Sequence, residues 1–137
     1  MQINLHDVGG QMLRVGVRLG QQTRRPLLLF NGIGANIELV EPFLDALDGP
    51  EAIIFDVPGV GGSPAPRLPY RPSMLARLSA RLLDQLEHDQ VDVLGLSWGG
   101  AAHFVFPPSE EAARKKPPLS RSFGEEAHTG FEPVPPP

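Results

Sequence analysis

The chain has 137 residues, the length of one domain, and an ordinary globular composition of 41% hydrophobic and 20% charged residues. A formal net charge of −4 argues against nucleic acids and anionic membranes as partners, because both attract basic surfaces. The lack of cysteine excludes disulfides and thiolate metal sites. There is no apolar run of the roughly 20 residues that a transmembrane helix needs, and the first residues show no secretory signal pattern. We therefore expect a cytoplasmic protein.

Five apolar segments predict β-strands in the first hundred residues. They are Ile3–Val8, Met12–Leu19, Leu27–Phe30, Ala52–Phe55 and Val91–Leu96. The Gly9-Gly10 pair between the first two is typical of a β-hairpin. The other three are short continuous runs, which are typical of strands buried on both faces of a parallel sheet.

Two helices are predicted between these strands. The first spans Glu41–Asp48, with Pro42 near its start, where a missing N–H costs little. The second follows Ser73 as N-cap, and its leucines form one stripe: Leu75, Leu78, Leu82 and Leu86. Strands that alternate with helices predict an α/β fold with a parallel sheet, to which the opening hairpin adds antiparallel strands at one end.

The composition changes abruptly after Ala101. Eight of the 16 prolines and four of the seven phenylalanines lie in the last 36 residues, where Leu119 is the only leucine and isoleucine is absent. Such a segment buries too little apolar surface to offset its ordering entropy. We therefore expect a partial core over residues 1–101 and a Pro-rich, disordered or frameshifted tail over residues 102–137.

The segment Gly95-Leu96-Ser97-Trp98-Gly99 has the pattern G-x-S-x-G directly after a predicted strand. A nucleophilic serine in this motif sits on a sharp, strained turn between strand and helix, and small residues on both sides let the turn close. The motif predicts Ser97 as a nucleophile on an elbow formed by Gly95 and Gly99. The N–H of Trp98, at the helix start, would then face a developing oxyanion.

Two more strand ends have glycine-rich sequences. Asn31–Asn36 follows a predicted strand and suits a second oxyanion element, with the N–H of Ile33 as the donor. Pro58–Ser63 is predicted to be a structural turn, since it lacks the Gly-Lys-Ser/Thr ending of a phosphate-binding loop and the G-x-G-x-x-G pattern.

Together, these three segments resemble the α/β-hydrolase superfamily, and most of all the intracellular poly(3-hydroxyalkanoate) depolymerases of bacteria. Asn31 stands where general esterases usually have histidine. The resemblance covers roughly Leu5 to Ala101. It implies a serine hydrolase of ester bonds, with Ser97 as nucleophile and Trp98 and Ile33 as oxyanion donors. It also implies a polyester substrate, contact with a storage granule, and neither a metal nor an organic cofactor.

In this fold the catalytic acid and the histidine follow the serine along the chain. Here no acid or histidine can be identified for these roles, because His103 and His128 lie in the Pro-rich segment and are poorly placed. A serine without a base is a poor nucleophile, so we expect this chain to be inactive. The interpretation is a hydrolase whose reading frame was lost just after Ala101.

Two alternatives stay open. The chain could be a different α/β-hydrolase, such as a small-ester esterase or a haloperoxidase-like enzyme. It could also be a non-catalytic fragment whose Pro-rich tail binds a protein that the sequence does not identify.

Overall fold

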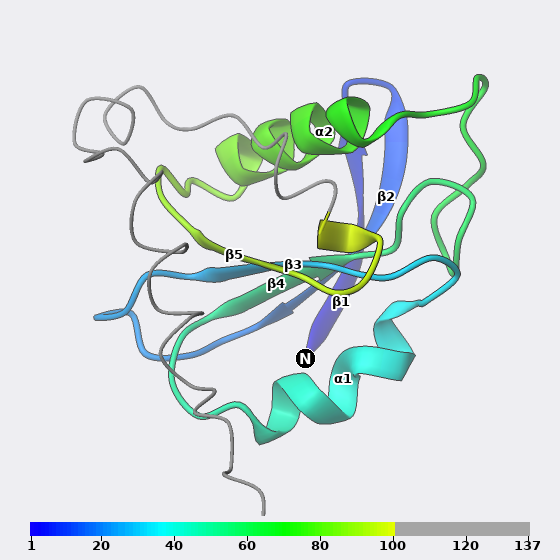
Figure 1. Cartoon of the computed structure of the whole chain (residues 1–137). Coiled ribbons are helices and arrows are strands. Elements are labelled where there is room, and N and C mark those ends of the chain that lie inside the picture. Colours follow the sequence, from blue (N-terminus) through cyan, green and yellow to red (C-terminus); the bar gives the residue numbers. More distant parts are fainter. Residues whose placement is uncertain (101–137) are drawn as a thin grey trace, which may run out of the picture. The chain divides into compact units, whose positions relative to one another are not determined.

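The computed structural model describes residues 1–100, in which a mixed β-sheet lies between two helices (Figure 1). In chain order the elements are β1 (Gln2–Val8), β2 (Gln11–Arg18), β3 (Leu27–Phe30), α1 (Ile37–Ala46), β4 (Ala52–Phe55), α2 (Pro72–Gln85) and β5 (Asp92–Gly95). The predicted tail, residues 102–137, and its boundary at Ala101 lie outside the described residues, so this division stays a prediction. Neither helix among residues 1–100 is long and apolar enough to cross a membrane.

The sheet has the strand order β1-β2-β4-β3-β5. The β1–β2 and β2–β4 pairs are antiparallel, whereas β3 is parallel to both β4 and β5. The predicted α/β fold with a hairpin at one edge is therefore confirmed. The hairpin turns at Gly9 and Gly10, whose φ angles of +62° and +87° suit a residue without a side chain.

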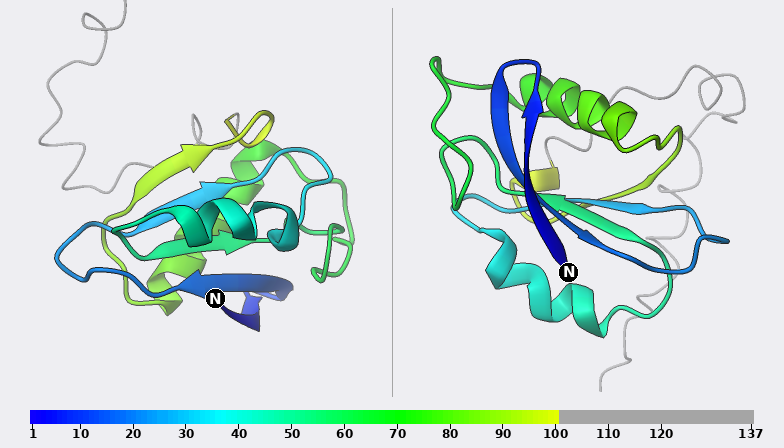
Figure 2. Two further views of the ribbon diagram at one scale, coloured as in Figure 1. Left: turned by 90° about the horizontal axis from the view of Figure 1, so that it is seen from below. Right: turned by 180° about the vertical axis from the view of Figure 1, so that it is seen from behind.

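One helix covers each face of the sheet (Figure 2). On the α2 side, alternate residues of β3 and β4 pack with the leucine stripe of the helix, and Phe30 and Phe55 meet edge to face at 5.7 Å between ring centroids. On the α1 side, Leu29, Ala52 and Ile54 pack against the buried stripe of α1: Ile37, Val40 and Leu44. As predicted, β4 is buried along its whole length. β3 is buried at three of its four positions.

The prediction for the first helix was wrong at its N-terminus. The helix begins at Ile37 rather than Glu41, because the side chain of Asn36 caps it and accepts the N–H of Leu39 at 3.2 Å. Pro42 consequently lies inside the helix and not near its start. Pro42 has no N–H to donate to the carbonyl of Glu38, so this carbonyl loses its helical partner. Both residues are exposed, and the carbonyl can therefore turn to solvent.

The second helix was predicted correctly in its apolar stripe but not in its cap. Leu75, Leu78 and Leu82 are buried, as expected. The N-cap is Arg71, which makes no side-chain capping bond, and Ser73 lies inside the first turn. Pro72 explains the shift, because its φ angle is already helical and its missing N–H costs nothing at the first helical position.

β5 is shorter and less buried than predicted. The strand covers Asp92–Gly95 rather than Val91–Leu96, and three of its four residues are half-buried. In the described part of the chain it pairs with β3 alone, which leaves it at an edge of the sheet. An edge strand has unpaired backbone groups that can pair with another chain.

The carboxylate of Asp56, directly after β4, joins three segments of the fold. It is fully buried and accepts the N–H of Ile37 at 2.8 Å and that of Gly62 at 2.9 Å. It also pairs with the guanidinium of Arg14 at 3.0 Å. This carboxylate therefore fixes the start of α1 and the turn after β4 relative to β2.

The same arginine extends the network to the surface of α1. Arg14 also hydrogen-bonds to Glu38, and this bond lowers the pKa of the Glu38 carboxyl below its usual value. The turn between β4 and α2 is held further by Ser63, whose hydroxyl donates to the Asp56 carbonyl at 2.6 Å. The interpretation of Pro58–Ser63 as a structural turn is thus supported by its contacts.

Replacing the cation of this network is expected to destabilise the fold. Arg14→Leu leaves the buried carboxylate of Asp56 without a positive partner, and the free energy of unfolding should fall by about 3 kcal/mol. The matched control is Arg25→Leu, which removes an exposed pair with Asp92 and should cost less than about 1 kcal/mol. Urea denaturation followed by Trp98 fluorescence measures both, and equal effects would contradict this role for Asp56.

Candidate active site

The candidate nucleophile Ser97 lies on a tight turn after β5. The N–H of Leu96 donates to the carbonyl of Phe30 at 2.9 Å, which holds the end of the strand against β3. Ser97 then has a φ of +53°, a left-handed conformation that non-glycine residues rarely adopt. Its exposed side chain stands at the carboxyl ends of the parallel strands, where sites of open α/β sheets lie.

The chain turns into a helix directly after the serine. Gly99 donates its N–H to the carbonyl of Leu96, and Gly100 donates its N–H to that of Ser97, each at 2.9 Å. Figure 1 shows this strand, turn and helix start at the end of the coloured chain. The local backbone therefore has the strand-to-helix turn that the G-x-S-x-G pattern requires.

The glycines on both sides of Ser97 leave no space for a side chain. A Cβ atom on Gly95 would lie 2.6 Å from the Cα of Gly100. A Cβ on Gly99 would lie 2.3 Å from the carbonyl oxygen of Phe30 and 2.6 Å from that of Asn31. The turn can thus close against β3 only with glycine at these positions.

The first glycine-rich loop lies beside the serine. A Cβ atom on Gly32 would be 3.5 Å from the Cβ of Ser97 and 4.0 Å from its hydroxyl oxygen. This contact brings the Gly32–Ile33 backbone next to the elbow. Ile33 is 77% exposed, so this loop lies at the surface beside Ser97.

The two candidate oxyanion donors have no competing acceptor among the residues that the structure describes. Within residues 1–100, neither the N–H of Ile33 nor that of Trp98 donates a hydrogen bond. The Trp98 ring packs toward the α2 side, where it meets Tyr70 edge to face at 6.4 Å between centroids. The indole therefore helps to anchor the turn.

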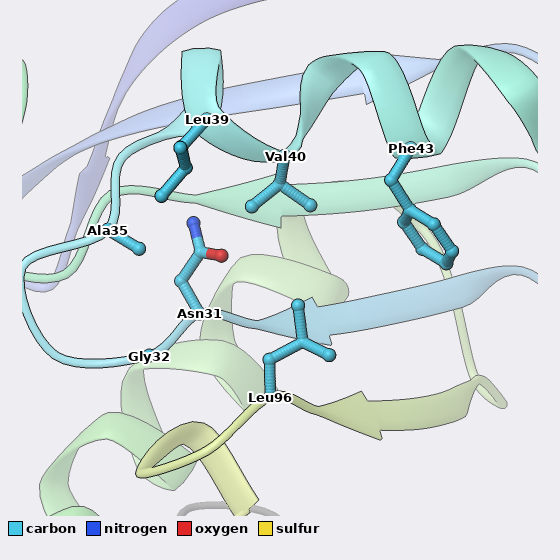
Figure 3. Close-up of a pocket in the computed structure, with 7 residues that line it drawn as sticks. All are labelled: Asn31, Gly32, Ala35, Leu39, Val40, Phe43 and Leu96. Carbon is cyan, nitrogen blue, oxygen red and sulfur yellow. The ribbon is translucent and has the colours of Figure 1, made fainter.

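A pocket of about 350 Å³ opens between α1 and the elbow (Figure 3). It is lined by Asn31, Gly32, Ala35, Leu39, Val40, Phe43 and Leu96. Leu96 directly precedes Ser97 along the chain, and Gly32 lies beside Ser97 in space. The pocket therefore adjoins the candidate nucleophile. Its side chains are apolar except for Asn31, which suits an aliphatic group.

The described residues do not supply an evident base for Ser97. His88 pairs with Glu51 at 2.7 Å, at the amino end of β4, and the serine follows the carboxyl end of β5. His6 lies within β1, at the other edge of the sheet. His103 and His128 lie outside the described residues, so the sequence-based interpretation of them stays a prediction.

Sequence reasoning missed two features of this site. It did not find the apolar pocket, because the pocket forms between α1 and the end of β5, which are distant along the chain. It also assigned no role to Asp56, whose only sequence signal is a carboxylate directly after a buried strand. The buried bonds of Asp56 to Ile37 and Gly62 become visible only when the turn folds back on α1.

The close packing of the elbow makes a sharp stability prediction. Gly99→Ala forces a methyl group onto the carbonyl of Phe30, and the free energy of unfolding should fall by about 3 kcal/mol. Gly100→Ala is the matched control, because a Cβ there meets no described atom within 4 Å. It should raise stability by up to about 1 kcal/mol through its higher helix propensity. Thermal denaturation of both variants measures the difference, and similar midpoints would rule out this packing.

Comparisons with known proteins identify the family to which this fold belongs. Residues 25–106 match the family model of the alpha/beta hydrolase fold. A poly(3-hydroxyalkanoate) depolymerase of Ectopseudomonas oleovorans is 58% identical over 96 residues, which are 69% of this chain and 34% of that protein. The chain therefore spans about a third of the length of this relative.

Solved structures show the same likeness. A hydrolase from Pseudomonas aeruginosa PA01 superposes with a TM-score of 0.67 and 29% identity, over 73% of this chain and 38% of that one. The enol-lactonase from Burkholderia xenovorans LB400 shares the fold with a TM-score of 0.70 and 24% identity, over 80% of this chain and 43% of that one. With a family model that matches most of its length, the chain belongs to the α/β-hydrolase family.

Proposed function

We propose that this chain contains the nucleophile part of a serine carboxylic-ester hydrolase that acts on poly(3-hydroxyalkanoate). Ser97 is the nucleophile, and Gly95 and Gly99 form its elbow. The N–H groups of Trp98 and Ile33 stabilise the oxyanion. The observation that carries the proposal is the left-handed φ of +53° at Ser97, on a turn packed against the Gly32–Ile33 loop.

The chemistry follows from these groups. The Ser97 oxygen attacks the ester carbonyl carbon, and the negative charge that develops on the carbonyl oxygen is stabilised by preorganised N–H donors. The attack also requires a base that takes the serine proton. Because no histidine of residues 1–100 is placed for this step, we propose that the chain of 137 residues has little or no activity.

The polyester substrate rests on the relative from Ectopseudomonas oleovorans, which is named as a poly(3-hydroxyalkanoate) depolymerase and shares 58% identity over the matched residues. The apolar pocket beside Ser97 supports a substrate with aliphatic side chains. A cytoplasmic location and contact with a storage granule belong to the same proposal, since they follow from the resemblance to intracellular depolymerases.

The expected inactivity can be tested directly. The full chain should hydrolyse p-nitrophenyl octanoate at the background rate, and Ser97→Ala should leave that rate unchanged, because no histidine of residues 1–100 is placed to act as its base. Release of p-nitrophenol measures both proteins. A rate that depends on Ser97 would show that a base exists in this chain and would contradict the inactivity.

A chimera tests the assigned chemistry separately. Residues 1–100 are fused to the part of the Ectopseudomonas oleovorans depolymerase that follows its matched segment, so that the remaining catalytic groups are supplied. We expect release of 3-hydroxy acids from a poly(3-hydroxyoctanoate) suspension. Ser97→Ala in the chimera should lower the rate by at least about 10³-fold. A folded chimera without Ser97-dependent hydrolysis would rule out the proposed function.

A further inference from the structure

The backbone of Ser97 is in a conformation that its surroundings must impose. Its φ is +53°. A left-handed φ is unfavourable for a residue with a side chain, and it persists only where neighbouring contacts hold it. The contacts that fix the turn around Ser97 therefore decide where its hydroxyl lies.

Backbone contacts hold this turn on the side of β3. The N–H of Leu96 donates to the carbonyl of Phe30 at 2.9 Å. Gly99 lies against the same carbonyl, where a Cβ atom would be at 2.3 Å. These contacts act through residues that flank Ser97 and Trp98, and they secure one side of the turn.

The indole of Trp98 supports the turn from the α2 side. Its ring meets that of Tyr70 edge to face, with 6.4 Å between the centroids and 71° between the ring planes. Both residues are half-buried and pack against the apolar cluster between α2 and the sheet. Aromatic pairs prefer such a geometry, so the contact fixes the orientation of the indole as well as its position.

Tyr70 is itself held by the start of α2. It directly precedes the N-cap Arg71, whose φ of −109° and ψ of 160° are the extended angles that a following proline favours. The carbonyl of Arg71 accepts the N–H of Met74 at 2.9 Å, which ties this residue to the first turn of the helix. A stiff segment thus presents the Tyr70 ring to Trp98.

We propose that Tyr70 is a positioning residue for the Ser97 elbow, because its ring holds the indole of Trp98 and the indole keeps Ser97 in the left-handed conformation. The inference rests on the proposed function and deepens it. Without the ring of Tyr70, the turn can relax toward ordinary backbone angles. The hydroxyl of Ser97 and the N–H of Trp98 then leave the positions that attack and oxyanion stabilisation require.

A double-mutant cycle in the full chain tests this role without turnover. Glycine adopts a left-handed φ at no steric cost, so Ser97→Gly relieves strain only while the elbow is held in that conformation. In the Tyr70→Ala background, we expect the shift in thermal midpoint caused by Ser97→Gly to be about 4 °C less favourable than in the parent chain. The effect of glycine on the unfolded chain is common to both backgrounds and cancels. Circular dichroism gives the four midpoints.

Three further variants support the cycle. Tyr70→Phe keeps the ring and should preserve the parent shift. Leu86→Ala is the matched control, because Leu86 packs against the same cluster at the other end of α2, a helix of 14 residues that is about 21 Å long. It should lower the midpoint but leave the shift from Ser97→Gly unchanged. Tyr70→Leu keeps apolar volume without a ring, and it replaces Tyr70→Ala if that variant does not fold.

The chimera with the Ectopseudomonas oleovorans depolymerase gives the catalytic readout. Tyr70→Ala should lower kcat about tenfold and leave KM unchanged, because the displaced groups act in the transition state. Tyr70→Phe should recover most of this loss. Leu86→Ala should lower the thermal midpoint of the chimera without lowering kcat.

The outcomes separate this inference from the proposed function. Equal shifts from Ser97→Gly with and without the Tyr70 ring would overturn the inference, and so would equal losses of kcat in Tyr70→Ala and Leu86→Ala. Coupling in the cycle together with an inactive chimera would support the hold of Tyr70 on the elbow and reject the ester-hydrolase function. Ser97-dependent hydrolysis without coupling would support the function and reject the role of Tyr70.

Discussion

The buried carboxylate of Asp56 is the interaction on which the arrangement of the described residues depends. It binds Arg14 of β2, the first N–H of α1 and the turn after β4, so three segments distant along the chain meet at one group. The Asn31–Asn36 loop ends where α1 begins. By holding the start of α1, Asp56 also holds the far end of the loop that lies beside Ser97. A buried carboxylate that loses its charged partner destabilises the folded state.

Backbone proximity at the elbow is the second constraint. Gly99 approaches the carbonyls at the end of β3 so closely that any side chain would clash. This contact puts the end of β5 and the first glycine-rich loop at one edge of the sheet. The result is an exposed hydroxyl, two N–H groups without acceptors among residues 1–100, and an adjoining apolar pocket. Those are groups that ester hydrolysis uses, apart from the base.

In residues 1–100, the sheet ends at β5, and the strands before β5 supply no base for Ser97. The Ectopseudomonas oleovorans relative is about three times as long as the part that this chain matches. Membership of the family therefore does not by itself give this chain the activity of a whole enzyme.

Much of the architecture follows from local sequence. The apolar runs of β3 and β4, the Gly9-Gly10 hairpin and the leucine stripe of α2 predict their elements, because burial and turn geometry act over a few residues. The G-x-S-x-G pattern likewise locates the turn around Ser97. Helix starts were less predictable, since Asn36 and Pro72 compete with neighbouring residues that are equally suited to cap or begin a helix.

The sequence by itself therefore determined the fold class and the candidate nucleophile of this protein. Only the tertiary structure decided what Asp56 does and where the apolar pocket forms. The hydrogen-bond partners of Asp56 lie up to 42 positions away along the chain, and the pocket forms between α1 and Leu96. Burial and hydrogen bonding of a polar side chain depend on which distant segments surround it, and no local pattern records that.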